Sequence, residues 1–295
     1  MRREKLFSKH GFYPFIVESN VLLHREAIEY GSRVVGHLLS LREDDRPVAV
    51  LDLACGGQPV SIAQMMGNFP DTRFHYTGID INPDQVEEAR SAFRYPLNVD
   101  SARIIEGNAW DPRNAGLKGR YDIIFMGMNL HHGTPEEVYY LVTQLQELIR
   151  DIGVFISHDW YRPDDEPYLR RPDHHPDNPA ESFQLVDQAT LASLAIPSIV
   201  ASEAKNSGDD PHWRVIYRNT VRDTLIERGG EVEGAKAGEQ HMRLRDYPIS
   251  LEELRTIVER VGVKAKILHY GDNDILTKFT AMPVLSRSAA VLAAL

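Results

Sequence analysis

The sequence predicts an α/β protein with a seven-stranded, mostly parallel sheet that carries helices on both faces and ends in an antiparallel hairpin. Three observations support this fold class. Segments rich in Val and Ile alternate with amphipathic segments of helical spacing between residues 48 and 160, which is typical of parallel strands joined by helices. A long insertion then interrupts the alternation. After the insertion, two further strand segments around the turn sequence GDND predict the hairpin.

A helical region precedes the sheet. From Pro14 to Leu41 the apolar residues recur at helical spacing, which predicts one or two helices before the polar loop REDDRP. The alternating region begins directly after this loop. Strands are expected at VAVLDLA, FHYTGIDI, ARIIEGNA, YDIIFMGMN and GVFISHDW, and helices at SIAQMMGNF, PDQVEEARSAF and PEEVYYLVTQLQELI.

The alternation stops at Tyr161. Residues 162–248 are rich in Asp, Pro, Arg and His, with helices expected at 180–196 and 212–228. Because this segment offers few apolar residues for a core of its own, we expect it to fold back over the sheet as a helical lid.

The core resumes after the insertion. Ser250 and Glu253 form an expected capping box at the start of the helix SLEELRTIVERVG, and the strands KAKILHYG and ILTKFTAMP follow. The predicted organisation therefore has four parts. These are an N-terminal helical cap (1–44), a sheet-containing core (45–161 and 249–285), the inserted lid (162–248) and a tail (286–295).

The composition is that of an ordinary globular protein. The 295 residues are 42% hydrophobic and 26% charged, and the net charge of −10 disfavours a nucleic-acid partner. The single cysteine, Cys55, excludes an intramolecular disulfide and fits a reducing compartment. Neither a signal peptide nor a membrane span is apparent, so we expect a cytoplasmic protein. The apolar tail AAVLAAL is a candidate contact for a homodimer.

The loop after the first strand indicates what the protein binds. It reads DLACGGQP, beginning at Asp52, and lacks both the glycine pattern of a dinucleotide site and the lysine of a phosphate-binding P-loop. A carboxylate at this strand end repels a pyrophosphate but suits an amine, as in S-adenosylmethionine (SAM). Asp80 ends the second strand, where an acid can bind ribose hydroxyls, and Ile81 beside it can pack on a purine. After the third strand, Asn108 and the Ala109 amide can contact the adenine edge.

These features resemble the class I SAM-dependent methyltransferases, which have a Rossmann-like core. The first family motif, an acid followed by a glycine-rich loop, corresponds to Asp52, Ala54, Gly56 and Gln58, with one glycine of the family pattern retained. The segment Gly127–His132 is similar to the N-x-L-H-H sequence of many small-molecule methyltransferases. The resemblance implies SAM as the cofactor, a small-molecule acceptor and a defined set of cofactor-binding residues: Asp52, Ala54, Gly56, Asp80, Ile81, Asn108, Ala109 and Met128.

Two histidines are the expected catalytic residues, because ligands of open parallel sheets bind at the carboxyl ends of the strands. His131 follows the fourth strand and His158 lies near the end of the fifth. Either can act as a general base or orient the acceptor. For His131 the alternative is a hydrogen bond to the backbone at the start of the loop. The expected substrate contacts are Tyr13, His132 (which we expect to point away more than His131), Trp160 and Arg218.

Other readings of the sequence stay open. A dense set of potential metal ligands (His158, Asp159, Asp173, His174, His175 and Asp177) has no recognised metal-binding spacing, so we predict no metal. The predicted activity is transfer of the sulfonium methyl to an O, N or C atom of a small molecule. The alternatives are a nucleic-acid methyltransferase and a non-catalytic SAM-binding protein.

Overall fold

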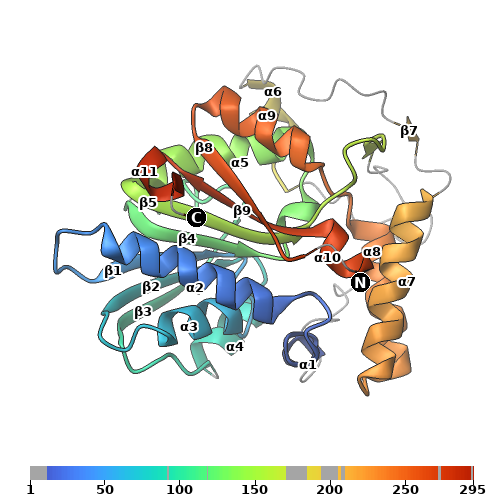
Figure 1. The fold of residues 1–295 in the computed structure, drawn as a ribbon, viewed down its shortest axis with the longest axis horizontal. Helices are drawn as coiled ribbons and strands as arrows, with labels where there is room; N and C mark the ends of the chain where they lie inside the picture. Colours follow the sequence, from blue (N-terminus) through green and yellow to red (C-terminus); the bar gives the residue numbers. More distant parts are fainter. Residues whose placement is uncertain are drawn as a thin grey trace.

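The computed structural model describes residues 12–295 except 92, 118, 171–184, 194–204, 207–209, 272–273 and 294. Its centre is a seven-stranded sheet with the strand order β3-β2-β1-β4-β5-β9-β8 (Figure 1). Pairing is parallel from β3 to β5, and β9 runs antiparallel to both of its neighbours. The strands are β1 (Val48–Leu53), β2 (Phe74–Asp80), β3 (Val99–Glu106), β4 (Tyr121–Gly127), β5 (Ile149–Trp160), β8 (Lys264–His269) and β9 (Thr280–Ser286).

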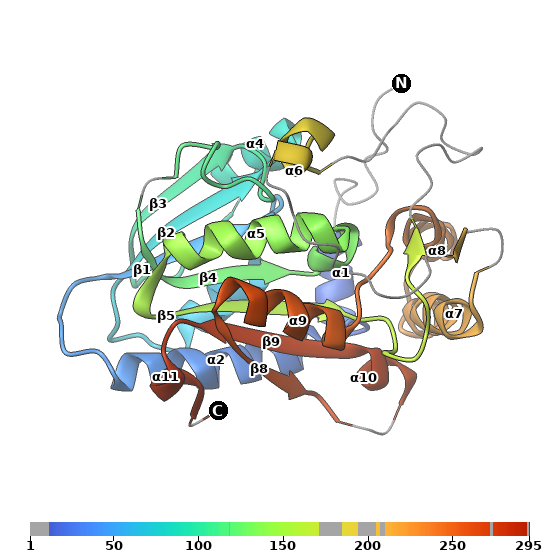
Figure 2. The ribbon, with the colours of Figure 1, turned by 90° about the horizontal axis from the view of Figure 1, so that it is seen from above.

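Helices cover both faces of the sheet (Figure 2). Neighbouring residues of a strand point to opposite faces, so Ile123 and Ile124 of β4 are both fully buried but belong to different cores. No helix in the described part of the chain is long and apolar enough to cross a membrane. One face carries α5 (Pro135–Leu148), α6 (Gln188–Ser193) and α9 (Leu251–Val261), and the other carries α2 (His24–Ser40), α3 (Val60–Gly67), α4 (Pro83–Ser91) and α11 (Ala289–Ala293).

Local sequence signals fix the helix ends. The expected capping box at α9 is present: Ser250 accepts a hydrogen bond from the Glu253 amide, and the Glu253 carboxylate accepts one from the Ser250 amide. Thr134 and Glu137 form the same arrangement at α5. Each box satisfies two backbone N–H groups that the helix itself leaves without partners.

A third cluster of helices lies at the end of the sheet where β5 terminates. In Figure 1, α7 (His212–Glu227) and α8 (Val232–Arg245) stand beside α10 (Ile275–Phe279) at this end. Trp160, the last residue of β5, stacks on Tyr217 of α7 with ring centroids 4.5 Å apart and an interplanar angle of 9°. This contact anchors the insertion to the sheet. The remaining elements are α1 (Phe12–Ser19), α7 (His212–Glu227), α8 (Val232–Arg245), α10 (Ile275–Phe279), and the short parallel pair β6 (Leu169–Arg170) and β7 (Lys205–Asn206).

The fold class predicted from the sequence is confirmed, with two local differences. Helix α8 was not expected, because only Ala235 and Met242 supply it with buried apolar side chains. The second hairpin strand begins at Thr280, after a short helix that was expected to be strand. Asp274 caps this helix, α10, and the segment buries Leu276 and Phe279 at a helical spacing of three residues.

Candidate active site

The loop after β1 turns through two left-handed residues. Ala54 has φ 57° and Gly56 has φ 63°, and the amide between them, that of Cys55, donates a hydrogen bond to the carbonyl of Ile79 at 3.0 Å. A left-handed conformation costs a non-glycine residue about 1–2 kcal/mol, and such strain is found preferentially at functional sites. The turn directs the amides of Gly56 and Gly57 towards the segment after β2.

Asp80 lies at the end of β2 and faces this loop. Its Oδ2 atom accepts a hydrogen bond from the Gly56 amide at 2.9 Å, and Oδ1 accepts one from the Asn82 amide at 2.8 Å. Burial raises the pKa of the carboxyl group, while the amide hydrogen bonds oppose the rise. Ile81, next to it, is 52% exposed. A fixed carboxylate beside an exposed apolar side chain can bind the hydroxyls of a ribose and one face of a purine.

Asp52 is buried at the end of β1, and the Tyr76 hydroxyl donates a hydrogen bond to its Oδ2 at 2.9 Å. Burial raises its pKa to about 8; the negative charge of Asp80 adds to the rise and the Tyr76 hydrogen bond opposes it. Asp52 lines a pocket of about 280 Å³, part of it open to solvent, together with Ala54 and Gly127. At neutral pH without a ligand, Asp52 is therefore largely protonated, and an ammonium group in the pocket would restore its charge.

The end of β3 is occupied by the insertion. The Asn108 side chain donates to the carbonyl of Leu185 at 2.5 Å and accepts a hydrogen bond from the Trp110 amide at 2.9 Å. The Leu185 amide in turn donates to Glu137 of α5 at 2.9 Å. Ala109 is buried. The sequence did not anticipate this contact, and it places insertion residues beside the expected adenine position.

The end of β4 leads to the two adjacent histidines. Met128 is left-handed, with φ 49°, and its amide donates to the carbonyl of His158 at 2.7 Å. After this turn, His131 Nδ1 lies 2.6 Å from Oδ1 of Asp159, and the His131 amide donates to Oδ2 of the same carboxylate at 3.1 Å. A carboxylate accepts hydrogen bonds, so Nδ1 of His131 carries a proton.

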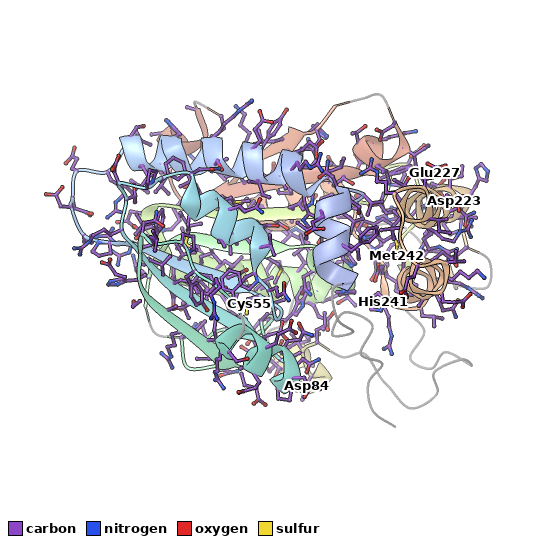
Figure 3. All side chains as sticks on the ribbon, turned by 90° about the horizontal axis from the view of Figure 1, so that it is seen from below. Cys55, Asp84, Asp223, Glu227, His241 and Met242 are labelled. Atoms are coloured by element: carbon purple, nitrogen blue, oxygen red, sulfur yellow. The ribbon has the colours of Figure 1, made fainter. Side chains whose placement is uncertain are left out.

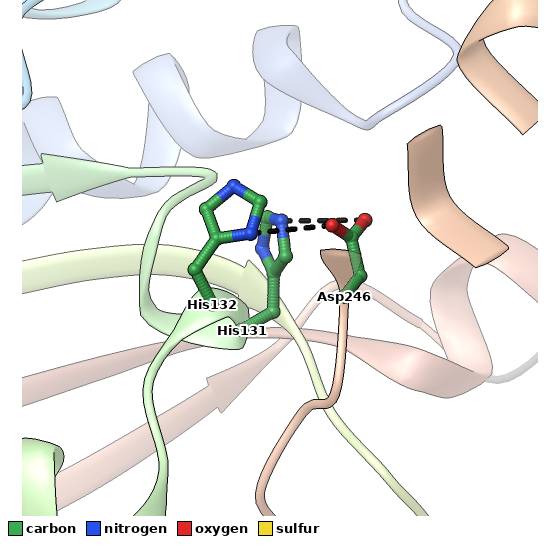
Figure 4. Close-up of side chains that lie close together, drawn as sticks. All are labelled: His131, His132 and Asp246. Atoms are coloured by element: carbon green, nitrogen blue, oxygen red, sulfur yellow. Dashed lines mark ion pairs between the residues drawn. The ribbon is translucent and has the colours of Figure 1, made fainter. Parts of the chain in front are cut away.

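A second carboxylate, Asp246, faces both histidines from the insertion (Figure 4). Its Oδ2 lies 3.4 Å from Nε2 of His131, and its Oδ1 lies 3.2 Å from Nδ1 of His132. A third imidazole, that of His241, has its Nε2 3.8 Å from Oδ1 of Asp246. Figure 3 shows His241 on α8, on the insertion side of the molecule and away from Cys55. We refer to His131, His132, His241 and Asp246 as the histidine–aspartate cluster.

The pKa values of the histidines in this cluster depend on the neighbouring carboxylates and on one another. Burial alone would lower the pKa of His131, but the carboxylates of Asp159 and Asp246 outweigh it and raise the pKa to about 10. Burial lowers the pKa of His132, and the charge on His131 lowers it further. Burial also lowers the pKa of His241, to about 4. At neutral pH without a ligand, His131 is therefore the protonated member of the cluster.

His158 occupies a different position from the one expected. Its ring is fully buried, Nδ1 lies 2.9 Å from the Tyr270 hydroxyl, and Nε2 lies 2.7 Å from the carbonyl of Leu22. Burial lowers its pKa to about 4. Both ring nitrogens are engaged by the protein itself, so His158 joins the segment before α2 and the segment after β8 to β5, and its catalytic role stays a prediction.

The side chains of three of the four expected substrate contacts are described. Arg218 is buried on α7 and pairs with Asp210 and Glu239, so its charge is already balanced within the insertion. His132 was expected to point away, but from the short helix η1 (Leu130–His132) its Nδ1 lies 3.2 Å from Asp246. Trp160 is buried in the insertion contact, with its ring centroid 5.8 Å from that of His131. The side chain of Tyr13 and the candidate ligands Asp173, His174, His175 and Asp177 lie outside the described residues.

Sequence reasoning missed Asp246 and the residues that hold it. The guanidinium of Arg214 donates hydrogen bonds to the carbonyls of Met242, Arg243 and Asp246 at 2.6–2.9 Å. The amide of Tyr247 donates to the carbonyl of His131 at 3.0 Å. The available signal was the sequence QHMRLRDY, in which a histidine and an aspartate flank two arginines. Nothing in this short sequence indicates which distant residues it contacts.

Comparison with known proteins agrees with this geometry. Residues 50–153 match a family model described as a methyltransferase domain. A protein of Synechocystis sp. described as an uncharacterized methyltransferase is 25% identical over 114 residues, which are 39% of this chain and 48% of that protein. The chain thus matches about half the length of this curated relative.

Two solved structures share the fold. The plantazolicin methyltransferase BamL has a TM-score of 0.52 at 12% identity, covering 97% of this chain and 94% of that one. An O-methyltransferase family protein from Burkholderia thailandensis has a TM-score of 0.50 at 14% identity, covering 92% and 58%. Residues 50–153 match a methyltransferase-domain model, and the fold that the chain shares with these two structures is the Rossmann-like fold that the sequence predicted.

Proposed function

We propose that this protein is a SAM-dependent methyltransferase that moves the sulfonium methyl group of SAM to a small-molecule acceptor. The observation that carries the proposal is the strand-end edge formed by β1 and β2. There, a strained loop and two buried carboxylates, Asp52 and Asp80, lie inside the methyltransferase domain. The structural relative BamL was solved with S-adenosylhomocysteine and a small-molecule analogue bound, which supports the same pairing of ligands here.

The cofactor position follows from the charges and shapes at this edge. The SAM amino group would lie near Asp52, where an ammonium offsets the cost of burying a carboxylate. The ribose hydroxyls would bind Asp80, and the adenine would pack against Ile81. Met128, at the left-handed turn after β4, would lie near the sulfonium. This assignment extends to Ala54, Gly56, Asn108 and Ala109, which border the same edge.

The acceptor position is proposed for the space between β4, β5 and the insertion. Methyl transfer from a sulfonium needs an aligned nucleophile and the exclusion of water more than it needs covalent help. His131 belongs to the core and Asp246 to the insertion, so the histidine–aspartate cluster is assembled only when the two are docked. We therefore propose that the insertion acts as the lid over the acceptor. His131 orients the acceptor here, because a histidine that keeps its proton at neutral pH is a poor base.

We favour a small-molecule acceptor over a nucleic acid. The chain carries a net charge of −10, and tracking a phosphate backbone requires a basic surface. The cytoplasmic location and the homodimer expected from the sequence stay predictions.

The test is the affinity for SAM of the Asp80→Ala variant, measured by calorimetry. Losing a charge-assisted, bidentate bond to the ribose should weaken binding by about 1.5–3 kcal/mol, which is tenfold or more. Asp71→Ala is the matched control, because Asp71 is exposed in the loop that precedes the same strand. Unchanged affinity in Asp80→Ala, with an unchanged melting temperature, would rule out this cofactor site.

A further inference from the structure

We propose that His131, His132 and Asp246 form a binding site for one divalent transition-metal ion, with Nε2 of His131, Nδ1 of His132 and the Asp246 carboxylate as ligands. These ligand atoms lie within 4.8 Å of one another. Figure 4 shows both imidazoles turned towards the same carboxylate, from which they are separated by the two distances given above. The metal-binding part of this proposal stands independently of the proposed function.

The distances between the histidine nitrogens and the Asp246 oxygens, 3.2 and 3.4 Å, are close to those between ligands of one metal ion. Metal–nitrogen and metal–oxygen bonds of about 2.0–2.2 Å at tetrahedral angles leave neighbouring ligand atoms about 3.3–3.6 Å apart. The separation between His131 Nε2 and Asp246 Oδ2 is 3.4 Å. A charge-assisted N–H···O bond would be shorter, about 2.7–2.9 Å. Oδ1 of Asp246 is buried and lies 3.2 Å from Nδ1 of His132, so each carboxylate oxygen faces an imidazole nitrogen. The carboxylate is therefore placed as a ligand would be.

The carboxylate of Asp159 prepares His131 for metal binding. Asp159 accepts a hydrogen bond from Nδ1 of His131 at 2.6 Å, which leaves Nε2 as the nitrogen directed at Asp246. Metal-binding histidines usually donate their other ring N–H to a carboxylate in this way, because the bond fixes both tautomer and ring orientation. Asp159 is itself held by the amides of His131 and Trp160. The carboxylate that would orient a metal-binding His131 is thus already in place.

Burial and charge favour a cation at this point. Asp159 and Asp246 are both buried, and in the described part of the chain their ion-pair partners are imidazoles, with no lysine or arginine side chain among them. Two buried carboxylates are costly unless positive charge lies beside them. A proton on His131 balances one negative charge, whereas a divalent ion balances both.

The donor atoms select the class of metal. Imidazole nitrogen with one carboxylate suits Zn²⁺, Co²⁺, Ni²⁺ or Mn²⁺, while Mg²⁺ prefers oxygen donors alone. Three protein ligands leave one tetrahedral position open, as in catalytic zinc sites. His241 lies at the border of the site, with its ring centroid 5.7 Å from that of His132. If the proposed function holds, the open position accepts the acceptor heteroatom, and the metal lowers the pKa of that atom before methyl transfer.

The experiment uses the full chain after treatment with a chelator. Zn²⁺ binding is measured by calorimetry, and Co²⁺ binding by the visible absorption of the tetrahedral ion. We expect one ion per chain, and no competition from Mg²⁺. The variants are His132→Gln and Asp246→Asn, each expected to weaken binding by more than the ~10–100-fold that is lost when a residue hydrogen-bonded to a metal ligand is removed. The matched control is His75→Gln, because His75 is exposed near the amino end of β2, whereas the cluster follows the carboxyl end of β4.

The outcomes are separable. Loss of Zn²⁺ binding in His132→Gln, with binding retained in His75→Gln, supports the site. If the wild-type chain binds no Zn²⁺ or Co²⁺, or if His132→Gln binds as well as the wild type, the proposal is wrong. Should Asp246→Asn fail to fold, His132→Gln alone decides. Asp80→Ala is expected to keep the metal while losing SAM, so a failure of the cofactor proposal would be distinguished from a failure of this one.

Discussion

The two sides of the strand-end edge are stabilised by different kinds of interaction. On the cofactor side, carboxylates are held by backbone amides and one hydroxyl: Gly56 and Asn82 donate to Asp80, and Tyr76 donates to Asp52. On the insertion side, charged side chains hold one another. Arg214 and Arg218 share Asp210, and the histidine–aspartate cluster joins core and insertion. The first side is rigid by virtue of its loop geometry, and the second depends on balanced charge.

This difference predicts which substitutions lower the stability and which lower the ligand affinity. Removing a side chain from the cofactor side leaves the loop and its amides in place. Removing one partner of a buried charge pair leaves the other charge uncompensated, which costs several kcal/mol. We therefore expect stability to depend most on the insertion side, and ligand affinity to depend most on the cofactor side.

The largest effect is expected for Arg214→Met. Arg214 is buried, pairs with Asp210 at 2.5 Å, donates to three carbonyls, and lies 4.5 Å from the ring centroid of Tyr247. Its loss should lower the free energy of unfolding by about 3–5 kcal/mol, measured by denaturant titration.

Arg222→Met is the control on the same helix. Its side chain is 30% exposed and pairs with Asp223, which is itself 56% exposed. We expect a change within about 0.5 kcal/mol. Equal losses in the two variants would contradict the view that buried charge pairs hold the insertion side together.

The next effect concerns the pH dependence of SAM affinity. The pKa of Asp52 is raised to about 8, so the carboxyl group is largely protonated at neutral pH, whereas a bound ammonium requires the carboxylate. Affinity should therefore rise with pH by up to about tenfold per unit between about pH 5.5 and 7.5, below the range where the SAM amino group titrates. Calorimetry across this range measures the slope.

The raised pKa of Asp52 also affects the stability of the ligand-free protein. A raised carboxyl pKa means that the folded state retains a proton which the unfolded state has already released. The contribution of Asp52 to stability therefore falls as pH rises from about 4 to 8. Asp52→Asn should reduce the pH dependence of both the SAM affinity and the stability. A wild-type affinity that is independent of pH would show that Asp52 does not meet the cofactor amine.

The smallest effect is expected for Ala54→Gly. Glycine removes the left-handed strain of about 1–2 kcal/mol at φ 57°, and the greater freedom of the unfolded chain offsets about 0.4–1 kcal/mol of this gain. The net result is a stabilisation of about 0.5–1 kcal/mol, measured by thermal unfolding. Ala49→Gly in the regular part of β1 should instead destabilise by about 0.5–1 kcal/mol. If both variants lose stability equally, the turn at Ala54 is not strained.

The cofactor side could be predicted from the sequence because its parts are local. Asp52, the loop and Asp80 lie within two consecutive strands, and the alternation of strands and helices fixes where each strand ends. The histidine–aspartate cluster could be predicted only in part. His131 was identified by its place after β4, but its partner Asp246 follows a helix with little apolar character. The buried position of His158 depends on Leu22 and Tyr270, from opposite ends of the chain, and no spacing in the sequence brings these together.

The position of β9 has a consequence for synthesis of the chain on the ribosome. Strand β9 fills the gap between β5 and β8, yet the insertion and three further elements, α9, β8 and α10, emerge before it. At typical elongation rates, on the order of ten seconds pass between the appearance of β5 and that of its second partner. During this interval one edge of β5, a strand of twelve residues with a largely buried sequence, has no neighbour, and open edges of this kind promote aggregation. Nascent chains that pause within the insertion should therefore be clients for chaperones that shield exposed strands.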